Sequence, residues 1–232
     1  MIQLLTSFYR DPSLLRQGEI MFCLEKNFIA KFDRYIFFCE NAYDADFLLK
    51  YITVLETVLK TDKSELTKKT LIITLEKRPT YNNFLETADK YADDNTVTVF
   101  CNSDIFFEGE NVAQLNGFFT EVQANRDLAI CLTRWDYQAN QHHMLFDRPD
   151  SQDTWAFRGK RKGRTSIEFT MGVAGCDNRF AYELTQMGYT LSNPSKRIKS
   201  YHVHTSNVRN YLENDKPKEI VPEPYQLIHP HD

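Results

Sequence analysis

Residues 97–107 read Val-Thr-Val-Phe-Cys-Asn-Ser-Asp-Ile-Phe-Phe, and this stretch decides the fold. Its first five residues are apolar or β-branched, which predicts a buried central strand that stops at Asn102-Ser103-Asp104. Parallel α/β sheets bind ligands just beyond the carboxyl ends of their strands, so Asn102 and Asp104 would face one ligand. Oxygen ligands suit a hard divalent cation, which a diphosphate leaving group needs. The simpler interpretation is an Asx turn or a cap for the next helix.

Length and composition limit the class of protein. The chain has 232 residues, which suits one α/β domain, and a formal charge of −4, which argues against a nucleic-acid partner. Its five cysteines lack metal-ligand spacing, and an odd number without a signal peptide predicts a reducing compartment. No stretch approaches the roughly 20 apolar residues of a membrane span. We therefore expect a cytoplasmic protein without a membrane span. A location at the inner face of a membrane is compatible with this expectation.

The first half of the chain alternates short apolar runs with segments of helical periodicity. Asp11-Pro12 and Pro79 resemble helix starts, with a cap residue or a proline at the first helical position. Successive strand–helix pairs predict a parallel sheet with right-handed crossovers. The predicted strands are 2–6, 35–39, 71–75 and 97–101, and the predicted helices are 11–30, 44–59, 79–91 and 112–122.

After residue 128 the pattern changes to strands with one clear helix, which predicts a mixed sheet. That helix has cap chemistry at Asp177 or Asn178 and ends at Gly188. The last 16 residues hold four of the eight prolines. We therefore expect one domain over 1–212 and an extended tail or linker over 213–232. The predicted strands are 128–133, 154–157, 168–173 and 198–204, and the predicted helix is 179–187.

Two basic features have a possible anion-binding role. Arg78 follows the third predicted strand, at the sheet edge where Asp104 is expected, and a guanidinium there can hold phosphate oxygens bidentately. The alternative is a solvated arginine at a helix start. Residues 158–164, Arg-Gly-Lys-Arg-Lys-Gly-Arg, predict either a solvated hairpin connection or a flap that closes over a diphosphate or an anionic acceptor.

Two aspartates are candidates for a catalytic base. A transferase that inverts at the sugar carbon needs a carboxylate to take the proton from the acceptor hydroxyl. Asp153 is our first choice, because it lies near Trp155, whose ring can stack against a sugar. The alternative is that Asp153 belongs to a polar turn. Asp177 follows glycines that permit close backbone approach at a helix start, and its alternative role is an N-cap.

The pair His202 and His204 lies on a predicted strand, so both imidazoles face the same side. Imidazole is a common ligand for ions such as manganese or zinc, and a histidine would complete a metal shell that Asp104 begins. The alternative is an exposed pair on a strand edge.

The order of these motifs resembles that of a small GT-A-type glycosyltransferase. The chain is similar, over about residues 1–212, to compact nucleotide-sugar transferases of bacterial surface-polysaccharide clusters and to glycosyltransferase domains of some large algal viruses. The resemblance implies a single GT-A-like (Rossmann-like) α/β domain with a parallel βα N-terminal half and a mixed-sheet C-terminal half. The motifs in order are Arg78, Asn102-Ser103-Asp104, Ser151-Gln152-Asp153, Gly175-Cys176-Asp177-Asn178 and His202-x-His204.

The resemblance also implies an activity and a set of site residues. The expected reaction moves a hexose-type unit from a UDP-sugar to a glycan or glycolipid acceptor, with Mn²⁺ or Mg²⁺ as cofactor. Asn102 replaces the first aspartate of the family's Asp-x-Asp, which lowers the expected metal affinity. The implied metal ligands are Asp104, His202 and His204, and the implied base is Asp153 or Asp177. The implied nucleotide-binding residues are Thr6, Ser7, Phe8, Tyr9, Arg78, Asn102, Ser103 and Asp104.

Two other classes compete with this interpretation. A nucleotidyltransferase shares a similar nucleotide-binding half, but such enzymes usually carry a glycine-rich basic loop after the first strand, and residues 7–10, Ser-Phe-Tyr-Arg, contain no glycine. A non-catalytic module that binds a sugar nucleotide or a glycan fits the Asn102 replacement. A UDP-release assay with and without manganese separates the three.

Overall fold

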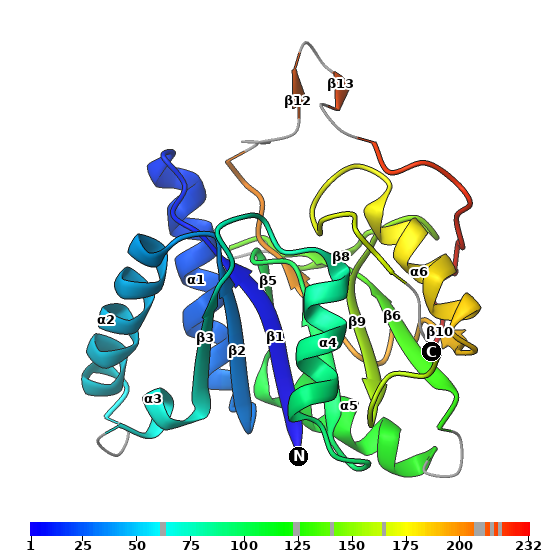
Figure 1. Ribbon diagram of the computed structural model, residues 1–232, viewed down its shortest axis with the longest axis horizontal. Helices are drawn as coiled ribbons and strands as arrows, with labels where there is room; N and C mark the ends of the chain where they lie inside the picture. The colour runs from blue at the N-terminus through cyan, green and yellow to red at the C-terminus, as the bar shows by residue number, and fades with distance from the viewer. Residues whose placement is uncertain are drawn as a thin grey trace.

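A seven-stranded mixed sheet runs through the centre of the molecule (Figure 1). The computed structural model describes residues 1–60, 64–122, 126–139, 142–163, 166–206, 212–213, 216–217 and 220–232. The strand order is β10-β6-β9-β4-β1-β2-β3. The strands are β1 (Ile2–Phe8), β2 (Arg34–Cys39), β3 (Thr70–Thr74), β4 (Val97–Cys101), β6 (Leu128–Thr133), β9 (Gln152–Arg158) and β10 (Thr190–Ser192).

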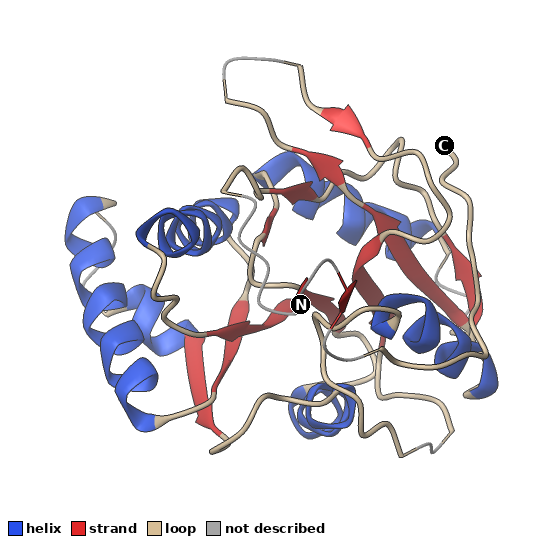
Figure 2. Ribbon diagram, turned by 90° about the horizontal axis from the view of Figure 1, so that it is seen from above, coloured by secondary structure: helices blue, strands red, loops and turns tan. Residues whose placement is uncertain are grey.

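Helices cover both faces of this sheet (Figure 2). Helices α1, α2 and α5 contribute to one cluster of buried apolar residues, and α4 and α6 contribute to a second. Successive residues of β1 alternate between the two clusters: Leu4 packs in the first and Leu5 in the second, as the period of a strand requires. The helices are α1 (Leu14–Ala30), α2 (Ala42–Val58), α3 (Glu65–Lys69), α4 (Tyr81–Tyr91), α5 (Gly109–Glu121) and α6 (Cys176–Gln186).

The sheet divides into the two halves that the sequence predicts. Strands β3, β2, β1 and β4 are parallel neighbours, which confirms the succession of βα units. Strand β9 is antiparallel to both β4 and β6, and β10 is parallel to β6. The carboxyl ends of β1 and β4 therefore meet at one edge, where the mixed half adjoins them.

A small second sheet brings the histidine pair to that edge. Its order is β5-β11-β7-β8, and β11 pairs His202 opposite Ile105. The Val203 amide also donates to the Asp104 carbonyl at 2.9 Å. Two segments about a hundred residues apart thus become neighbours beyond β4. The strands are β5 (Ile105–Phe106), β7 (Trp135–Asp136), β8 (Met144–Leu145) and β11 (Tyr201–His202).

Several helices begin at other residues than predicted. Helix α4 begins at Tyr81 with Thr80 as its N-cap, so Pro79 lies before the helix, and α5 begins at Gly109 rather than at residue 112. Helix α1 begins at Leu14 rather than at Asp11: Ser13 is its N-cap, and the Asp11 side chain instead accepts a hydrogen bond from the Ser13 amide at 2.9 Å. The N-cap of α6 is Gly175, with φ of 80°, so Asp177 lies in the first turn and is not the cap. The predicted end of that helix at Gly188 is confirmed, since Met187 is the C-cap.

Two predicted strands are wrong in whole or in part. Residues 168–173 form no strand beyond an isolated bridge between Thr80 and Thr170, because they cross the start of α4, where the Phe169 carbonyl accepts from the Tyr81 amide. Of residues 198–204, only Tyr201 and His202 form a strand. Helix α3 and strand β10 were not predicted.

The basic loop lies at the wrong end of the sheet for a flap. Strand β9 runs antiparallel, so its last residue, Arg158, pairs with Val97 at the amino end of β4. Beyond it, Arg161 forms an ion pair with Asp89 of α4 at 2.7 Å. The described part of the loop therefore lies away from the carboxyl ends of the strands, and Arg164 falls outside the described residues.

The described part of the proline-rich end packs on the domain. After β12 (Leu212–Glu213) and β13 (Lys216–Pro217), residues 220–232 have the expected extended form. They return along α6: the Val221 amide donates to the Ala174 carbonyl at 2.9 Å, and the His231 amide donates to the Asn193 carbonyl at 2.9 Å. Residues 220–232 thus have an extended form and pack against the domain that we expected over residues 1–212.

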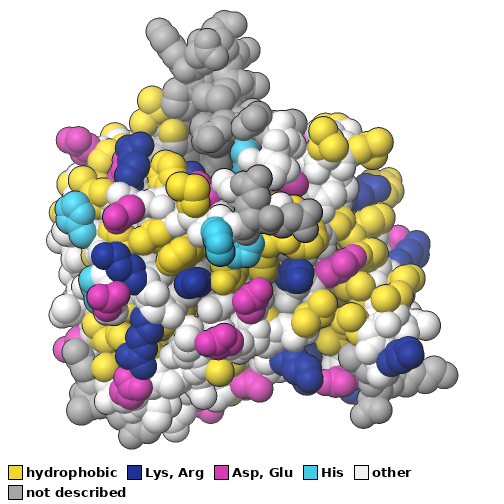
Figure 3. Space-filling view, turned by 180° about the vertical axis from the view of Figure 1, so that it is seen from behind, with side chains coloured by type: hydrophobic (Ala, Val, Ile, Leu, Met, Phe, Trp, Pro, Cys, Tyr) yellow, Lys and Arg dark blue, Asp and Glu magenta, His cyan; other side chains and the backbone are white. Residues whose placement is uncertain are grey.

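Surface and core fit the compositional expectations. No helix among the described residues combines the length and the apolar character that a membrane span needs. All five cysteines are buried and unpaired. On the face seen in Figure 3, basic and acidic side chains are interspersed.

Candidate functional site

A pocket of about 280 Å³ opens at the carboxyl ends of β1 and β4. Segments from both halves of the sheet line it, as expected where a parallel sheet adjoins a mixed one. Most of the predicted residues meet there, together with the 171–175 turn and two arginines, Arg16 and Arg134, that were not predicted. The predicted residues that line the pocket are Ser7, Tyr9, Arg78, Asn102, Ser103, Asp104, Asp153, Asp177, His202 and His204.

Two predicted nucleotide-binding side chains do not line the pocket. Thr6 and Phe8 lie in β1, and Phe8 packs in the core against Phe47, with ring centroids 6.1 Å apart. Ser7 and Tyr9 point to the other side and reach the pocket. The prediction for Thr6 and Phe8 is therefore wrong for their side chains, because alternate residues of a strand face opposite sides.

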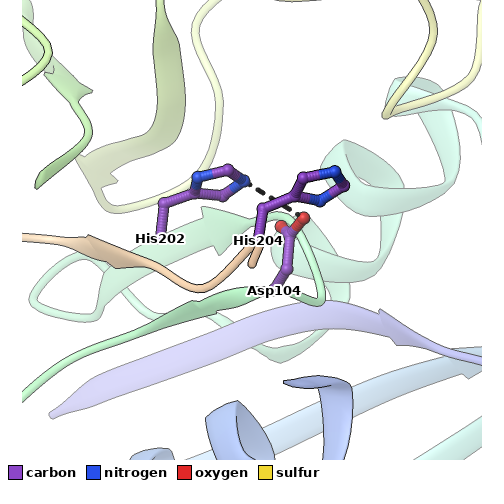
Figure 4. A group of neighbouring side chains, drawn as sticks. All are labelled: Asp104, His202 and His204. Carbon is purple, nitrogen blue, oxygen red and sulfur yellow. Dashed lines mark ion pairs between the residues drawn. The ribbon is translucent and has the colours of Figure 1, made fainter. Parts of the chain in front are cut away.

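Asp104, His202 and His204 form a compact cluster on one wall (Figure 4). One ligand atom from each lies within 4.8 Å of the other two. The His202 Nε2 atom is 3.4 Å from the Asp104 carboxylate, and the two imidazole rings stack with centroids 5.5 Å apart. The histidines thus line the pocket and are partly buried, rather than forming an exposed pair on a strand edge.

A second carboxylate orients His202. The His202 Nδ1 atom lies 3.3 Å from Asp136, so the ring bridges Asp136 and Asp104. Burial alone would lower the pKa of His202, but these two carboxylates outweigh it and raise its pKa to about 9. A carboxylate behind a histidine fixes the tautomer and orientation of a metal ligand. Asp136 was not predicted; it is the last residue of β7 and pairs with His202 of β11.

Arg16 approaches Asp104 from the other side. Its guanidinium donates to the Asp104 carboxylate at 2.6 Å, to Glu19 at 2.9 Å and to the Val203 carbonyl at 3.3 Å. Burial opposes ionisation of Asp104, but His202 and Arg16 outweigh it and hold the pKa of Asp104 far below its usual range. These two cations therefore favour the ionised form of Asp104.

The cluster has the donor set of a divalent-ion site. Asp104 Oδ1 and His204 Nε2 are buried polar atoms without a hydrogen-bond partner in the described part of the chain. Burial, Arg16 and His202 lower the pKa of His204, which favours the neutral form of the ring that a metal ligand requires. His202 must first release its proton. Carboxylate and imidazole together suit an ion such as Mn²⁺.

Asn102 is explained by its neighbour across the sheet. Its amide donates to Asp153 Oδ1 at 2.9 Å, while Arg134 donates to the other oxygen of Asp153 at 3.1 Å. An aspartate at position 102 would set two carboxylates at this distance, which is costly unless one is protonated. The Asn102 side chain thus contacts Asp153, and both oxygens of Asp153 accept hydrogen bonds.

Asp177 has the opposite environment to Asp104. Its Oδ1 atom accepts from the Tyr81 hydroxyl at 3.4 Å and from the Cys176 thiol at 3.2 Å. Burial, and then the negative charge of Asp153, raise the pKa of Asp177 well above its usual range. No ion pair to Asp177 occurs within the described residues. The pocket therefore holds a carboxyl group that is readily protonated.

The turn before α6 fixes Asp177 by close backbone packing. Gly175 has φ of 80°, and a Cβ there would lie 2.7 Å from the Val221 carbonyl and 2.6 Å from the Tyr225 hydroxyl. Only glycine fits this conformation and this space. The C-terminal segment, which composition placed outside the domain, thus supports the pocket wall that carries Asp177.

The fold is shared with solved glycosyltransferase structures. No protein-family model and no curated protein matches the sequence. The structure of S. aureus TarS residues 1–349 in complex with UDP matches with a TM-score of 0.52 and 13% identity, over 88% of this chain and 60% of that chain. The same TarS fragment alone gives a TM-score of 0.51 at 13% identity, over 87% and 60%.

A third structure supports the same conclusion. The mannosyltransferase PcManGT from Pyrobaculum calidifontis, in complex with GDP-Man and Mn²⁺, has a TM-score of 0.54 and 12% identity, over 90% of this chain and 58% of that chain. The chain spans about three fifths of the length of these structures. At these identities the likeness concerns the fold. The chain has the GT-A-like fold of nucleotide-sugar glycosyltransferases, as its sequence predicts.

Proposed function

We propose that the chain is a glycosyltransferase that moves a hexose-type unit from a UDP-sugar to a hydroxyl of a glycan or glycolipid. One observation carries the proposal: a single pocket holds an anion with cationic partners, Asp104, and a carboxyl group of raised pKa, Asp177. Sugar transfer needs both a site for the leaving diphosphate and an acceptor for a proton. The solved relatives in fold that hold UDP or GDP-Man support a sugar nucleotide as donor.

The nucleotide would bind on the parallel side of the pocket. Ser7 and Tyr9 come from the end of β1, and Arg78 comes from the loop after β3. Arg78 lies 3.5 Å from the Gly172 carbonyl, a long contact that leaves its guanidinium able to turn toward phosphate oxygens. Asp104, His202 and His204 would hold Mn²⁺ or Mg²⁺, which when bound neutralises charge on the departing diphosphate.

Asp177 suits the role of base better than Asp153, our first choice from sequence. Both oxygens of Asp153 accept from Asn102 and Arg134, and such bonds weaken a carboxylate as a proton acceptor. Asp177 has a raised pKa and therefore a higher proton affinity. In our proposal the acceptor oxygen forms a bond to the sugar carbon as the bond from that carbon to the diphosphate oxygen breaks. The acceptor proton passes to Asp177, and a single displacement of this kind inverts the sugar carbon.

Asp153 then has a different task. Its ion pair with Arg134 lies in the same pocket, and charged side chains of this kind accept and donate hydrogen bonds to sugar hydroxyls. It also raises the pKa of Asp177 through its negative charge. We therefore treat Asp153 as a residue that positions the sugar and tunes the base. Five buried, unpaired cysteines support the expected cytoplasmic location.

The experiment is a panel of UDP-sugars and GDP-sugars with candidate glycan acceptors, each with Mn²⁺ and with a chelator. We expect release of UDP that depends on one donor and increases with acceptor. Asp177→Asn serves as the matched control, since it keeps shape but removes the proton acceptor. Release of pyrophosphate would instead indicate a nucleotidyltransferase, and UDP binding without turnover would indicate a binding module.

A further inference from the structure

Arg16 is a buried cation at the centre of the site that the proposed chemistry does not use. It lies in the first turn of α1 and is only 7% exposed, yet it lines the pocket. Arginine is charged at any physiological pH, so its burial is tolerated only with anionic partners. Those partners are Glu19 at 2.9 Å and Asp104 at 2.6 Å.

Glu19 anchors one side of the guanidinium and is itself fully engaged. Its Oε1 atom accepts from the backbone amides of Thr205 and Ser206, at 2.6 Å and 2.7 Å. Its Oε2 atom accepts from the Ser206 hydroxyl at 2.9 Å and from Arg16. This carboxylate ties α1 to the segment that carries His204. Glu19, which does not itself line the pocket, therefore holds the Arg16 guanidinium in position there.

Asp104 is the partner that Arg16 shares with the proposed divalent ion. The guanidinium binds the Oδ2 atom of Asp104 and also lies 2.9 Å from His204 Nδ1. An ion held by Asp104 and His204 would lie within a few ångströms of this positive charge, where like charges repel strongly in a buried site. Arg16 and the ion would thus both draw on the carboxylate of Asp104.

We propose that Arg16 is a diphosphate-binding residue that competes with the divalent ion for Asp104. In the absence of the ion, Arg16 and Asp104 form an ion pair. When a nucleoside diphosphate binds, the planar donor fork of Arg16 contacts its phosphate oxygens and leaves Asp104 to the ion. The inference rests on the proposed function and names the residue that gives the site an affinity for diphosphate without metal.

The first test is calorimetric titration of Mn²⁺ in the absence of nucleotide. Arg16→Met removes the charge but keeps an unbranched chain that fills the space. We expect it to bind Mn²⁺ about tenfold more tightly than the wild type, the worth of one charge-assisted contact. Arg126→Met is the control, because Arg126 is an exposed arginine in an ion pair with Asp94. Equal Mn²⁺ affinity of Arg16→Met and wild type would overturn the competition.

The second test is titration of UDP in a chelator. We expect Arg16→Met to lose about tenfold in metal-free UDP affinity, while Arg126→Met is unchanged. Arg16→Lys keeps the charge without the fork, so its Mn²⁺ affinity should stay near that of the wild type and its UDP loss should be smaller. Unchanged metal-free UDP affinity in both Arg16 variants would contradict the phosphate contact.

These outcomes are separable from the proposed function and from misfolding. The Mn²⁺ titration requires no turnover, so it tests Arg16 even if no donor sugar is transferred. Failure of the wild type to release UDP from any donor would remove the proposed activity and leave the Mn²⁺ result standing. Should Arg16→Met fail to fold, Arg16→Lys carries the test: a metal-free UDP affinity equal to that of the wild type would then overturn the bidentate contact.

Discussion

The two walls of the pocket hold carboxyl groups in opposite electrostatic states. On the parallel side, Asp104 is buried against Arg16 and His202, and these cations hold its pKa far below its usual range. On the mixed side, Asp177 is partly buried beside Asp153 with neutral hydrogen-bond donors, and its pKa is raised. Burial alone would raise the pKa of both groups. The difference comes from the neighbours of each carboxyl group: Arg16 and His202 beside Asp104, and Asp153 beside Asp177.

This contrast assigns chemistry to each wall. A carboxylate that stays ionised can hold a cation or organise a diphosphate site, whereas one of raised pKa can exchange a proton near neutral pH. Separating the two pKa values within one pocket is how a protein obtains both functions from aspartate. The variants below are ordered from the largest expected effect to the smallest.

Asp177→Asn should have the largest effect. It keeps the shape of the side chain but removes the proton acceptor, so the transfer rate should fall by about 10²–10⁴-fold, the usual worth of a general base. UDP affinity should barely change, because the base acts on the acceptor in the transition state. Steady-state transfer and UDP titration measure the two. Transfer at the wild-type rate would remove Asp177 from the role of base.

Asp104→Asn should weaken nucleotide binding when metal is present. Loss of the anionic ligand is expected to lower UDP affinity in Mn²⁺ by about tenfold. The advantage that Mn²⁺ gives over a chelator should disappear as well. Calorimetric titration in both conditions checks this. A variant that still binds UDP more tightly with Mn²⁺ would show that the ion is held by other residues.

Asp153→Asn should shift the pH profile of transfer. Removing a negative charge beside Asp177 favours its ionised form, so the pKa of Asp177 falls. The rising, acidic limb of the profile should therefore move to lower pH, by about one unit. The rate above that limb should be reduced only modestly. A fall of the transfer rate at every pH by the full worth of a base would instead restore Asp153 to that role.

The sequence predicted the parallel half better than the mixed half. Apolar runs such as 35–39 and 97–101 are buried on both faces, so composition alone identifies them. Residues 168–173 are equally strand-like in sequence, yet they form no strand. They cross the start of α4, where the Phe169 carbonyl accepts from the Tyr81 amide. Such tertiary choices are not encoded in local periodicity.

Site residues were predictable where they follow strand ends. Asp104 and Arg78 were found this way, and Arg134, directly after β6, could have been found by the same rule. Arg16 gave no such signal, because a buried arginine and a solvated one look alike in the first turn of a helix. The alternation of β1 could have excluded the side chains of Thr6 and Phe8 from the pocket.

Asn102→Asp should have the smallest effect. It sets a second carboxylate near Asp153, where the Asn102 amide now donates at 2.9 Å. The free energy of unfolding should fall by about 1 kcal/mol at neutral pH, and the loss should vanish below about pH 4, where carboxyl groups are protonated. Thermal unfolding at several pH values checks this. Unchanged stability with tighter Mn²⁺ binding would mean that residue 102 faces the ion.

The most direct test of the contrast between the two walls is a ¹³C NMR titration of the aspartate carboxyl groups in the ligand-free protein. Spectra of Asp104→Asn and Asp177→Asn assign the two signals. We predict that Asp177 titrates well above about 3.9, the ordinary aspartate value, while Asp104 stays ionised down to the lowest pH at which the protein is folded. Two carboxyl groups that both titrate near 3.9 would contradict the account.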